Sequence, residues 1–300
     1  MKHYISSLLF LTLAICSCQK MSFEENEIPN DSRTKTMSFK LGGFSMTGFE
    51  GMQSENNSES RAATNKNNYT DNLLLGIYDM DGNLVDSIQH QKKTENNTTY
   101  GTFSHTLQYG KYTIIAMGWN GTQECEVHSL DSITFNEGWV PNTWLCRQNI
   151  IVSESYSDSR ILNLKRCVAR FKMIMKDKSI PKELHKFVVN FSGAGNSLNS
   201  ETRHCANVTN FSRTISVNIT PSDVTDISSY CFLPEDSTAI DINVTAYDIN
   251  NSILADRTFN NVPMKLNYST NYSGIYFPMD EISESIDFDT KFEGEINSNF

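Results

Sequence analysis

Cys16 and Cys18, two cysteines separated by one residue, are the first side chains in the sequence that could carry out chemistry. Thiols this close together could bind a metal ion or form a redox pair. They follow Lys2 and an apolar run from Tyr4 to Ile15, which is typical of a secretory signal and too short to span a bilayer as a stable helix. Because the pair lies where such a signal is cleaved, with no partner histidine beside it, the sequence argues against a metal or redox site and favours an exported protein.

The residues before Cys18 resemble a bacterial lipoprotein signal, in which an aliphatic residue stands three positions before the acylated cysteine and a small residue directly before it. Ile15 and Ser17 fill these positions for Cys18, whereas bulky Ile15 would occupy the small position for Cys16. The resemblance implies a signal peptide over residues 1–17 and fatty acyl chains such as palmitate on Cys18. Each buried methylene adds about 0.8 kcal/mol, so several chains would anchor the protein stably in the outer membrane. Ordinary secretion with cleavage nearby is the alternative.

Residues 18–34 are polar and include an acidic cluster of Glu24, Glu25 and Glu27. This composition predicts a flexible tether. An acidic cluster just after the lipid-bearing cysteine also resembles the surface-export signal of Bacteroidales lipoproteins, which implies a position on the cell surface. The net charge of −10 argues against nucleic acid and anionic membrane surfaces as partners.

The remaining titratable residues do not form a recognisable catalytic or metal-binding motif. The histidines after residue 18 are scattered: His90, His105, His128, His185 and His204. His204 and Cys205 are sequence neighbours and would point to opposite faces of a strand, so they make a poor catalytic dyad. The run 79–83, "DMDGN", lacks the downstream glutamate of a calcium loop and fits a hairpin turn. We therefore expect no enzyme activity, no metal and no cofactor.

Five further cysteines are widely spaced and form no Cys-x-x-Cys pair, namely Cys125, Cys146, Cys167, Cys205 and Cys231. Zinc binding is therefore not expected. Disulfides are chemically allowed outside the cytoplasm, but an odd number leaves at least one thiol unpaired. Their pairing stays open, and small buried hydrophobic side chains are the commoner role for such residues.

Strand patterns dominate the chain after residue 35. Residues 36–48 alternate apolar and polar side chains, with Met37, Phe39 and Leu41 on one face, and a long polar loop follows over 51–72. Residues 73–87 read as strand, turn and strand, and the segment 101–119 reads as a hairpin that turns at Gly110. Many short strands of this kind predict an all-β fold of sandwich type.

Residues 167–175 alternate in the same way, with Cys167, Phe171 and Met173 on the apolar face. The basic side chains beside them, Arg166, Arg170 and Lys172, are interpreted as a solvated strand face and not as a nucleic-acid patch. Only a turn or so of helix is expected, around Pro181 to His185.

An internal echo suggests two related domains. Residues 73–87 align without gaps to 242–256, and in both segments an apolar strand ends in Tyr-Asp before a polar turn. About 280 residues follow the signal, which is more than a typical single domain. The polar stretch 152–160 separates two apolar segments, so the sequence predicts domains over 35–155 and 156–300. Chance similarity between two hairpins is the alternative.

Several segments resemble fimbrial subunits of the Bacteroidales. They are "LLLGIYDMDGNLV", "YGKYTIIAMGWNG", "LNLKRCVARFKMIMKDKSIP" and the closing "NNVPMKLNYSTNYSGIYF". The chain is similar in these segments to the fimbrillin and fimbrial-anchor superfamily of type V pili. The resemblance implies two transthyretin-like Greek-key sandwiches, export as an outer-membrane lipoprotein, a role in adhesion, and partnership with other fimbrial subunits through strand exchange.

Strand exchange would involve the strand over residues 36–48. Loss of an edge strand exposes an apolar groove and unpaired backbone groups, which a strand from another subunit can fill. In stalk subunits of the resembled family, a trypsin-like protease cuts after an arginine in the loop behind this strand. Arg61 matches by position, and Ala62 would become the new N-terminus; Arg33 is the other choice but precedes the strand. A loop arginine without this role is the alternative.

A stand-alone surface lipoprotein that binds glycans or host proteins is the second hypothesis. Glycan binding favours exposed aromatic side chains. Trp119, Trp139 and Trp144 are too few and too clustered to suggest a sugar platform, and Trp119 ends a core-like strand. The fimbrial hypothesis is therefore preferred, with stalk, anchor and tip subunits left open.

Overall fold

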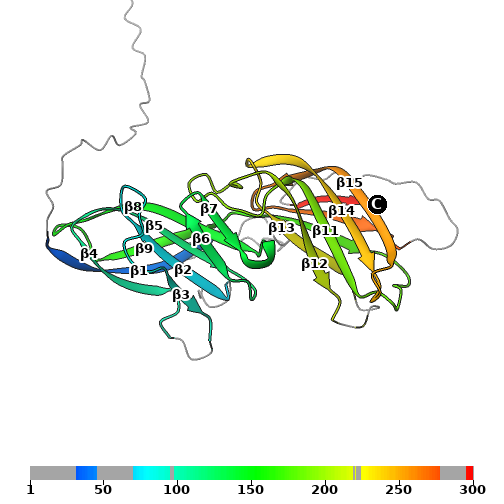
Figure 1. Cartoon of the computed structure of the whole chain (residues 1–300), viewed down its shortest axis with the longest axis horizontal. Coiled ribbons are helices and arrows are strands. Elements are labelled where there is room, and N and C mark those ends of the chain that lie inside the picture. Colours follow the sequence, from blue (N-terminus) through cyan, green and yellow to red (C-terminus); the bar gives the residue numbers. More distant parts are fainter. Residues whose placement is uncertain are drawn as a thin grey trace, which may run out of the picture.

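The computed structural model describes residues 32–45, 70–94, 98–218, 220, 224–277 and 295–299. Within these ranges the chain folds almost entirely into β-strands, and the only helical element is a single 3-10 turn, η2 (Asn136–Gly138). The strands lie in two elongated lobes that follow each other along the chain (Figure 1). The expectation of an all-β, sandwich-type fold is confirmed.

The first lobe is built on one seven-stranded sheet. Its strands, in spatial order, are β3 (Gln89–Lys92), β2 (Asn72–Tyr78), β5 (Gly110–Trp119), β8 (Thr143–Val152), β9 (Ser159–Arg166), β1 (Thr34–Ser45) and β4 (Thr102–Gln108). A separate hairpin of β6 (Cys125–Ser129) and β7 (Ser132–Phe135) lies beside the sheet.

This sheet folds over on itself. β8 and β9 pair at only two positions, Trp144 with Arg166 and Leu145 with Lys165, so the two halves of the sheet can turn face to face. Apolar side chains of β1, β4 and β9 pack in one cluster with those of β2, β5 and β8. The alternation of apolar and polar residues along each strand supplies this shared core, as expected for a sandwich.

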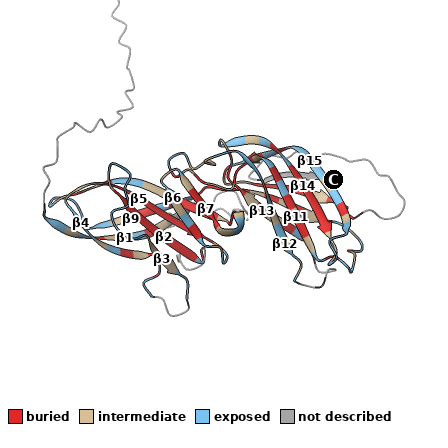
Figure 2. Cartoon of the chain, in the orientation of Figure 1, coloured by how far each residue is buried: buried red, intermediate tan, exposed pale blue. Residues whose placement is uncertain are grey.

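The second lobe is a sandwich of two four-stranded sheets. One contains β13 (Asp226–Cys231), β10 (Ala169–Met175), β16 (Ser269–Gly274) and β17 (Glu295–Asn299). The other contains β12 (Thr209–Ser216), β11 (Lys186–Ala194), β14 (Ser237–Tyr247) and β15 (Ile253–Lys265). Buried side chains line the facing sides of the two sheets, while their outer faces are largely exposed (Figure 2).

A third apolar cluster joins the lobes. β2 and β5 are buried on both faces, and their second faces contribute Leu74, Ile115 and Met117 to a cluster that also contains Leu198 and Phe232 of the second lobe. We call it the junction cluster. Strands buried on both faces need continuous apolar runs, which explains the sequence "LLLGIY" of β2.

The prediction of a hairpin that turns at Gly110 is wrong. β4 pairs with β1, whereas β5 pairs with β2 and β8. The turn before Gly110 therefore carries the chain from one half of the folded sheet to the other. A local pattern of alternation shows which faces are apolar, but it does not show which strand lies alongside.

The domain division after residue 155 stays a prediction. Strand pairing favours a later division, after Arg166, because β9 pairs with β1 and β8 of the first sheet. The polar stretch 152–160 connects β8 to β9 within that sheet.

The alternation predicted over 167–175 is confirmed for β10, where Phe171 and Met173 are buried and Lys172 pairs with Asp226 at 3.3 Å. Arg166 departs from the prediction of a solvated face, since only 4% of it is exposed. Its guanidinium lies over the Trp144 ring, 4.8 Å from the ring centroid, and it donates hydrogen bonds to the side chains of Asn142 and Asn267. A buried charge satisfied in this way cannot be recognised from alternation alone.

The echo between 73–87 and 242–256 corresponds to two turns with the same hydrogen bonds. The Asp79 carboxylate accepts the backbone N–H groups of Asp81 and Asn83 at 2.9 and 2.8 Å. The Asp248 carboxylate likewise accepts those of Asn250 and Ser252 at 2.8 and 2.7 Å. The Asn83 side-chain amide also donates to the Asp79 carboxylate, at 3.1 Å, and has the largest effect in lowering the pKa of Asp79. The backbone bonds lower the pKa of both aspartates, so the Asp79 oxygens stabilise the turn that the sequence predicted.

All five described cysteines are free thiols. Burial raises the pKa of Cys125 to about 12 and also raises the pKa values of Cys167 and Cys231. Cys146 and Cys205 are only half-buried. Because the thiolate is the reactive form, exposure and pKa together set the reactivity of each residue.

We expect a maleimide reagent to label Cys146 and Cys205 in the folded protein, and all five cysteines after unfolding in guanidinium. Peptide mass spectrometry assigns the labels. Rapid labelling of Cys167 or Cys231 under native conditions would contradict the packing described for these strands.

Candidate functional site

β1 lies inside the first sheet and is paired along both of its edges (Figure 1). It runs antiparallel to β4, from Thr34 opposite Gln108 to Lys40 opposite Thr102. It runs parallel to β9, where Ser38 lies opposite Ser159. The prediction that the exchangeable strand is an edge strand is wrong: among the described strands, the edge beyond β1 is β4.

The apolar face of β1 fills the core of the first lobe. Met37, Phe39 and Leu41 are each 0% exposed, whereas Thr36 and Lys40 on the other face are exposed. Burying one such apolar side chain contributes about 1.5–3 kcal/mol, so the three together contribute roughly 5–9 kcal/mol. This is comparable to the whole stability of a typical domain, about 5–15 kcal/mol. Below, the term β1 slot means the space that these three side chains occupy, together with the backbone hydrogen-bonding edges of β4 and β9 on either side of it.

Two basic residues fasten the start of β1 to the loop between β8 and β9. The Lys35 ammonium donates to the backbone carbonyls of Ser153 and Glu154, at 3.2 and 3.3 Å, and to that of Tyr156. The Arg33 guanidinium forms a salt bridge of 3.2 Å with the Glu154 carboxylate. Such exposed ion pairs contribute little free energy, so their main effect is to fix where the preceding segment enters the lobe.

Of the site residues predicted from sequence, Cys18, Arg61 and Ala62 lie outside the described residues. Their lipidation and cleavage stay predictions. Arg33 is described, and it lies directly before β1 with its backbone carbonyl accepting a hydrogen bond from the Tyr109 N–H at 2.9 Å. A cut after Arg33 would therefore leave β1 in the sheet.

The structure brings no catalytic group together around the histidines. His204 Nε2 lies 3.1 Å from an Asp236 carboxylate oxygen, while the Cys205 N–H donates to the Leu233 carbonyl. Within the described ranges, no cluster of three or more His, Cys, Asp or Glu side chains could hold a metal ion. In the same part of the chain, no helix is long and apolar enough to cross a membrane.

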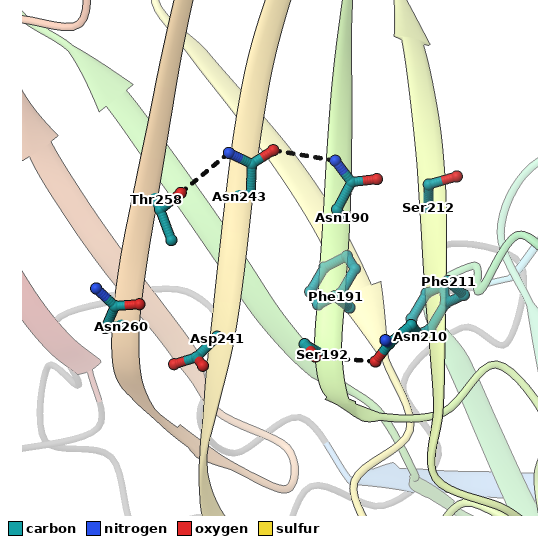
Figure 3. A pocket seen from close by; sticks show the side chains of 10 residues that line it. All are labelled: Asn190, Phe191, Ser192, Asn210, Phe211, Ser212, Asp241, Asn243, Thr258 and Asn260. Atoms are coloured by element: carbon teal, nitrogen blue, oxygen red, sulfur yellow. Dashed lines mark hydrogen bonds between the residues drawn. The ribbon is translucent and has the colours of Figure 1, made fainter.

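A polar groove of about 490 Å³ crosses the outer face of the sheet formed by β12, β11, β14 and β15 (Figure 3). Its side chains are mostly amides and hydroxyls, and they include Asp241 but no lysine or arginine. Asn243 lies at its centre, accepting a hydrogen bond from Asn190 at 3.0 Å and donating one to Thr258 at 3.1 Å. No motif in the sequence predicted this groove, although an outward face rich in asparagine instead of lysine and glutamate was a usable signal.

The aromatic side chains at the groove offer no exposed platform. Phe191 is 1% exposed and stacks on the half-buried Phe211, with ring centroids 4.9 Å apart. Trp119 and Trp144 are also buried, at 3% and 2% exposure, while Trp139 is partly buried, with the Arg213 guanidinium 4.9 Å from its ring centroid.

Comparison with protein families gives a match over residues 45–300 to a family described as a family of unknown function, DUF6562. A comparison with curated proteins finds no match. Among solved structures, the chain is similar to a candidate adhesin from Bacteroides ovatus, with 11% identity, a TM-score of 0.49, and coverage of 76% of this chain and 78% of that one.

Two further structures belong to fimbrial proteins. One is a fimbrial assembly protein from Parabacteroides distasonis, with 13% identity, a TM-score of 0.41, and coverage of 81% of this chain and 92% of the other. The second is the fimbrial anchor protein Mfa2 from Porphyromonas gingivalis, with 12% identity, a TM-score of 0.41, and coverage of 75% and 82%.

We expect Phe39→Ala to destabilise the first lobe by about 3–5 kcal/mol, because it leaves a cavity in the core. Lys40→Ala is the matched control on the exposed face of the same strand and should change stability by less than about 0.5 kcal/mol. Urea unfolding followed by circular dichroism measures both. Equal effects of the two substitutions would show that β1 does not fill the core.

Proposed function

We propose that this chain, which belongs to the family of unknown function DUF6562, is a non-enzymatic lipoprotein of the bacterial cell surface that serves as a fimbrial subunit or anchor and takes part in adhesion. In this proposal, acylated Cys18 attaches the chain to the outer membrane. Other fimbrial subunits are its partners, and they assemble with it by strand donation.

The observation that carries the proposal is the double pairing of β1. β4 has β1 as its only partner among the described strands, so loss of β1 would leave unpaired backbone groups on both β4 and β9. It would also open the core where Met37, Phe39 and Leu41 are now fully buried. Exposed backbone ladders next to an apolar groove bind an added strand strongly, because hydrogen bonds and apolar burial act together.

β1 is also the first of the described strands. Cleavage at a point between β1 and β2 would detach it without interrupting any other described strand. A cut after Arg61 falls in that interval and would give Ala62 as the new N-terminus. The proposal for a stalk subunit is that this cut releases the lipid and β1 together. An anchor would keep both.

The N-terminus of protein recovered from the cell surface distinguishes these fates. Acylated Cys18 indicates an anchor, and Ala62 indicates a processed subunit that accepts a donor strand. A different N-terminus would contradict both forms of the proposal.

Cleavage in vitro tests strand exchange directly. After trypsin treatment, we expect the wild-type chain to form detergent-stable oligomers on unboiled gels, while the double variant Arg61→Ala with Lys66→Ala, which removes both trypsin sites between β1 and β2, remains a monomer. A synthetic peptide of residues 34–45 added during cleavage should suppress the oligomers by refilling the β1 slot. A wild-type chain that is cut after Arg61, loses β1 and stays monomeric would contradict strand exchange.

The polar groove supports a second candidate function, binding of a neutral glycan. Amide and hydroxyl side chains from four strands are suited to hydrogen-bond a polyhydroxylated ligand, but the groove lacks the exposed aromatic ring that favours sugar binding. This function is therefore the less favoured one.

An array of neutral oligosaccharides tests it with the variant Asn190→Ala. If the groove binds glycan, this substitution at an exposed position should weaken binding severalfold, while Asn250→Ala, an exposed asparagine outside the groove, should leave it unchanged. Absence of wild-type binding to every neutral oligosaccharide would exclude the groove as a glycan site.

A further inference from the structure

A small basic hollow of about 210 Å³ lies where the two lobes meet. Four of its side chains are cationic: Lys165, Arg166, Arg203 and Lys265. The first two belong to β9 of the first lobe, and the other two belong to the second lobe. In a chain with a net charge of −10, this concentration of positive charge is a local exception. We call it the junction pocket.

Three of the cations in the junction pocket lack a neutralising carboxylate among the described residues. Asp236 is the only carboxylate among its lining residues, and that carboxylate already lies 3.1 Å from His204 Nε2. Lys165, Arg203 and Lys265 form no salt bridge with any carboxylate of the described residues. Like charges held close together repel one another, and a bound anion would remove that cost.

The fold holds the Arg166 side chain and the Arg203 backbone in place. Arg166 is 4% exposed and donates hydrogen bonds of 3.0 Å to the amide oxygens of Asn142 and Asn267. Arg203 has a positive φ of 65° and donates its backbone N–H to the Asn199 carbonyl at 2.9 Å. Both arginines line the same hollow.

We propose that the junction pocket binds an oxyanion of phosphate or sulfate size, either free or carried as a monoester on a larger molecule. Arginine presents a planar fork of N–H donors that matches such an anion, and lysine adds a compact point charge. The pocket is too small for a whole oligosaccharide, so it would recognise the charged group alone. Because both lobes supply cations, the bound anion would also tie the lobes together.

Isothermal titration of the full mature chain with phosphate and with sulfate, at constant ionic strength kept with chloride, tests this site. The test variant is Lys165→Gln with Lys265→Gln, two exposed lysines whose loss leaves the core intact. The control is Lys178→Gln with Lys182→Gln, which removes the same charge from exposed positions outside the pocket.

We expect saturable binding to the wild type and the control, and at least tenfold weaker binding to the pocket variant. Arg203→Lys keeps the charge but removes the fork, and should give an intermediate loss. No saturable binding to the wild type, or equal binding to the pocket and control variants, would overturn the proposal. Glucose 6-phosphate is titrated in parallel. If it competes with phosphate, the pocket accepts an esterified anion; if it does not compete, the pocket is specific for the free ion.

Discussion

Pairing of β1 on both edges is the constraint on which the first lobe depends. β4 has no other strand partner in the described part of the chain, and β9 joins β8 at only two residue pairs. β1 therefore joins β4 and β9 into one half of the folded sheet, and its apolar face closes the core between this half and the other. One strand supplies two hydrogen-bond ladders and a row of buried side chains, so its contribution cannot be replaced by neighbouring contacts.

The sequence predicted well which faces of the strands are apolar, but it predicted poorly which strands pair with each other. Alternation correctly placed Met37, Phe39 and Leu41 on one buried face, and the Tyr-Asp echo marked two turns with matching hydrogen bonds. Pairing across the sheet depends on contacts between residues far apart in the chain, such as Ser38 with Ser159. No local pattern contains that information. This is why a hairpin was expected at Gly110, where the chain in fact crosses between the halves of the sheet.

The burial of charged side chains was the other feature that could not be predicted from the sequence. Arg166 continues an alternating basic run, yet it lies between the lobes over the Trp144 ring. A similar contact occurs where Arg213 of β12 lies 4.9 Å from the ring centroid of Trp139. Together with the junction cluster, these contacts set the lobes against each other by packing. A force applied to a strand in the β1 slot would therefore be transmitted to the second lobe through packed side chains and not through a flexible linker.

The position of β1 also links anchoring to assembly. The predicted lipid site at Cys18 precedes β1 in the same N-terminal segment, so in the proposed stalk form one cut between β1 and β2 would remove the lipid and empty the β1 slot together. A chain that keeps its lipid also keeps its own strand and has no vacancy for another. A cut ahead of β1, such as one after Arg33, would separate the two effects, because Arg33 lies before β1 and is fixed to Glu154. That product would be released from the membrane with a full slot, so it could neither anchor nor accept a donor strand. The choice of arginine therefore determines whether proteolysis produces a building block or only sheds the protein.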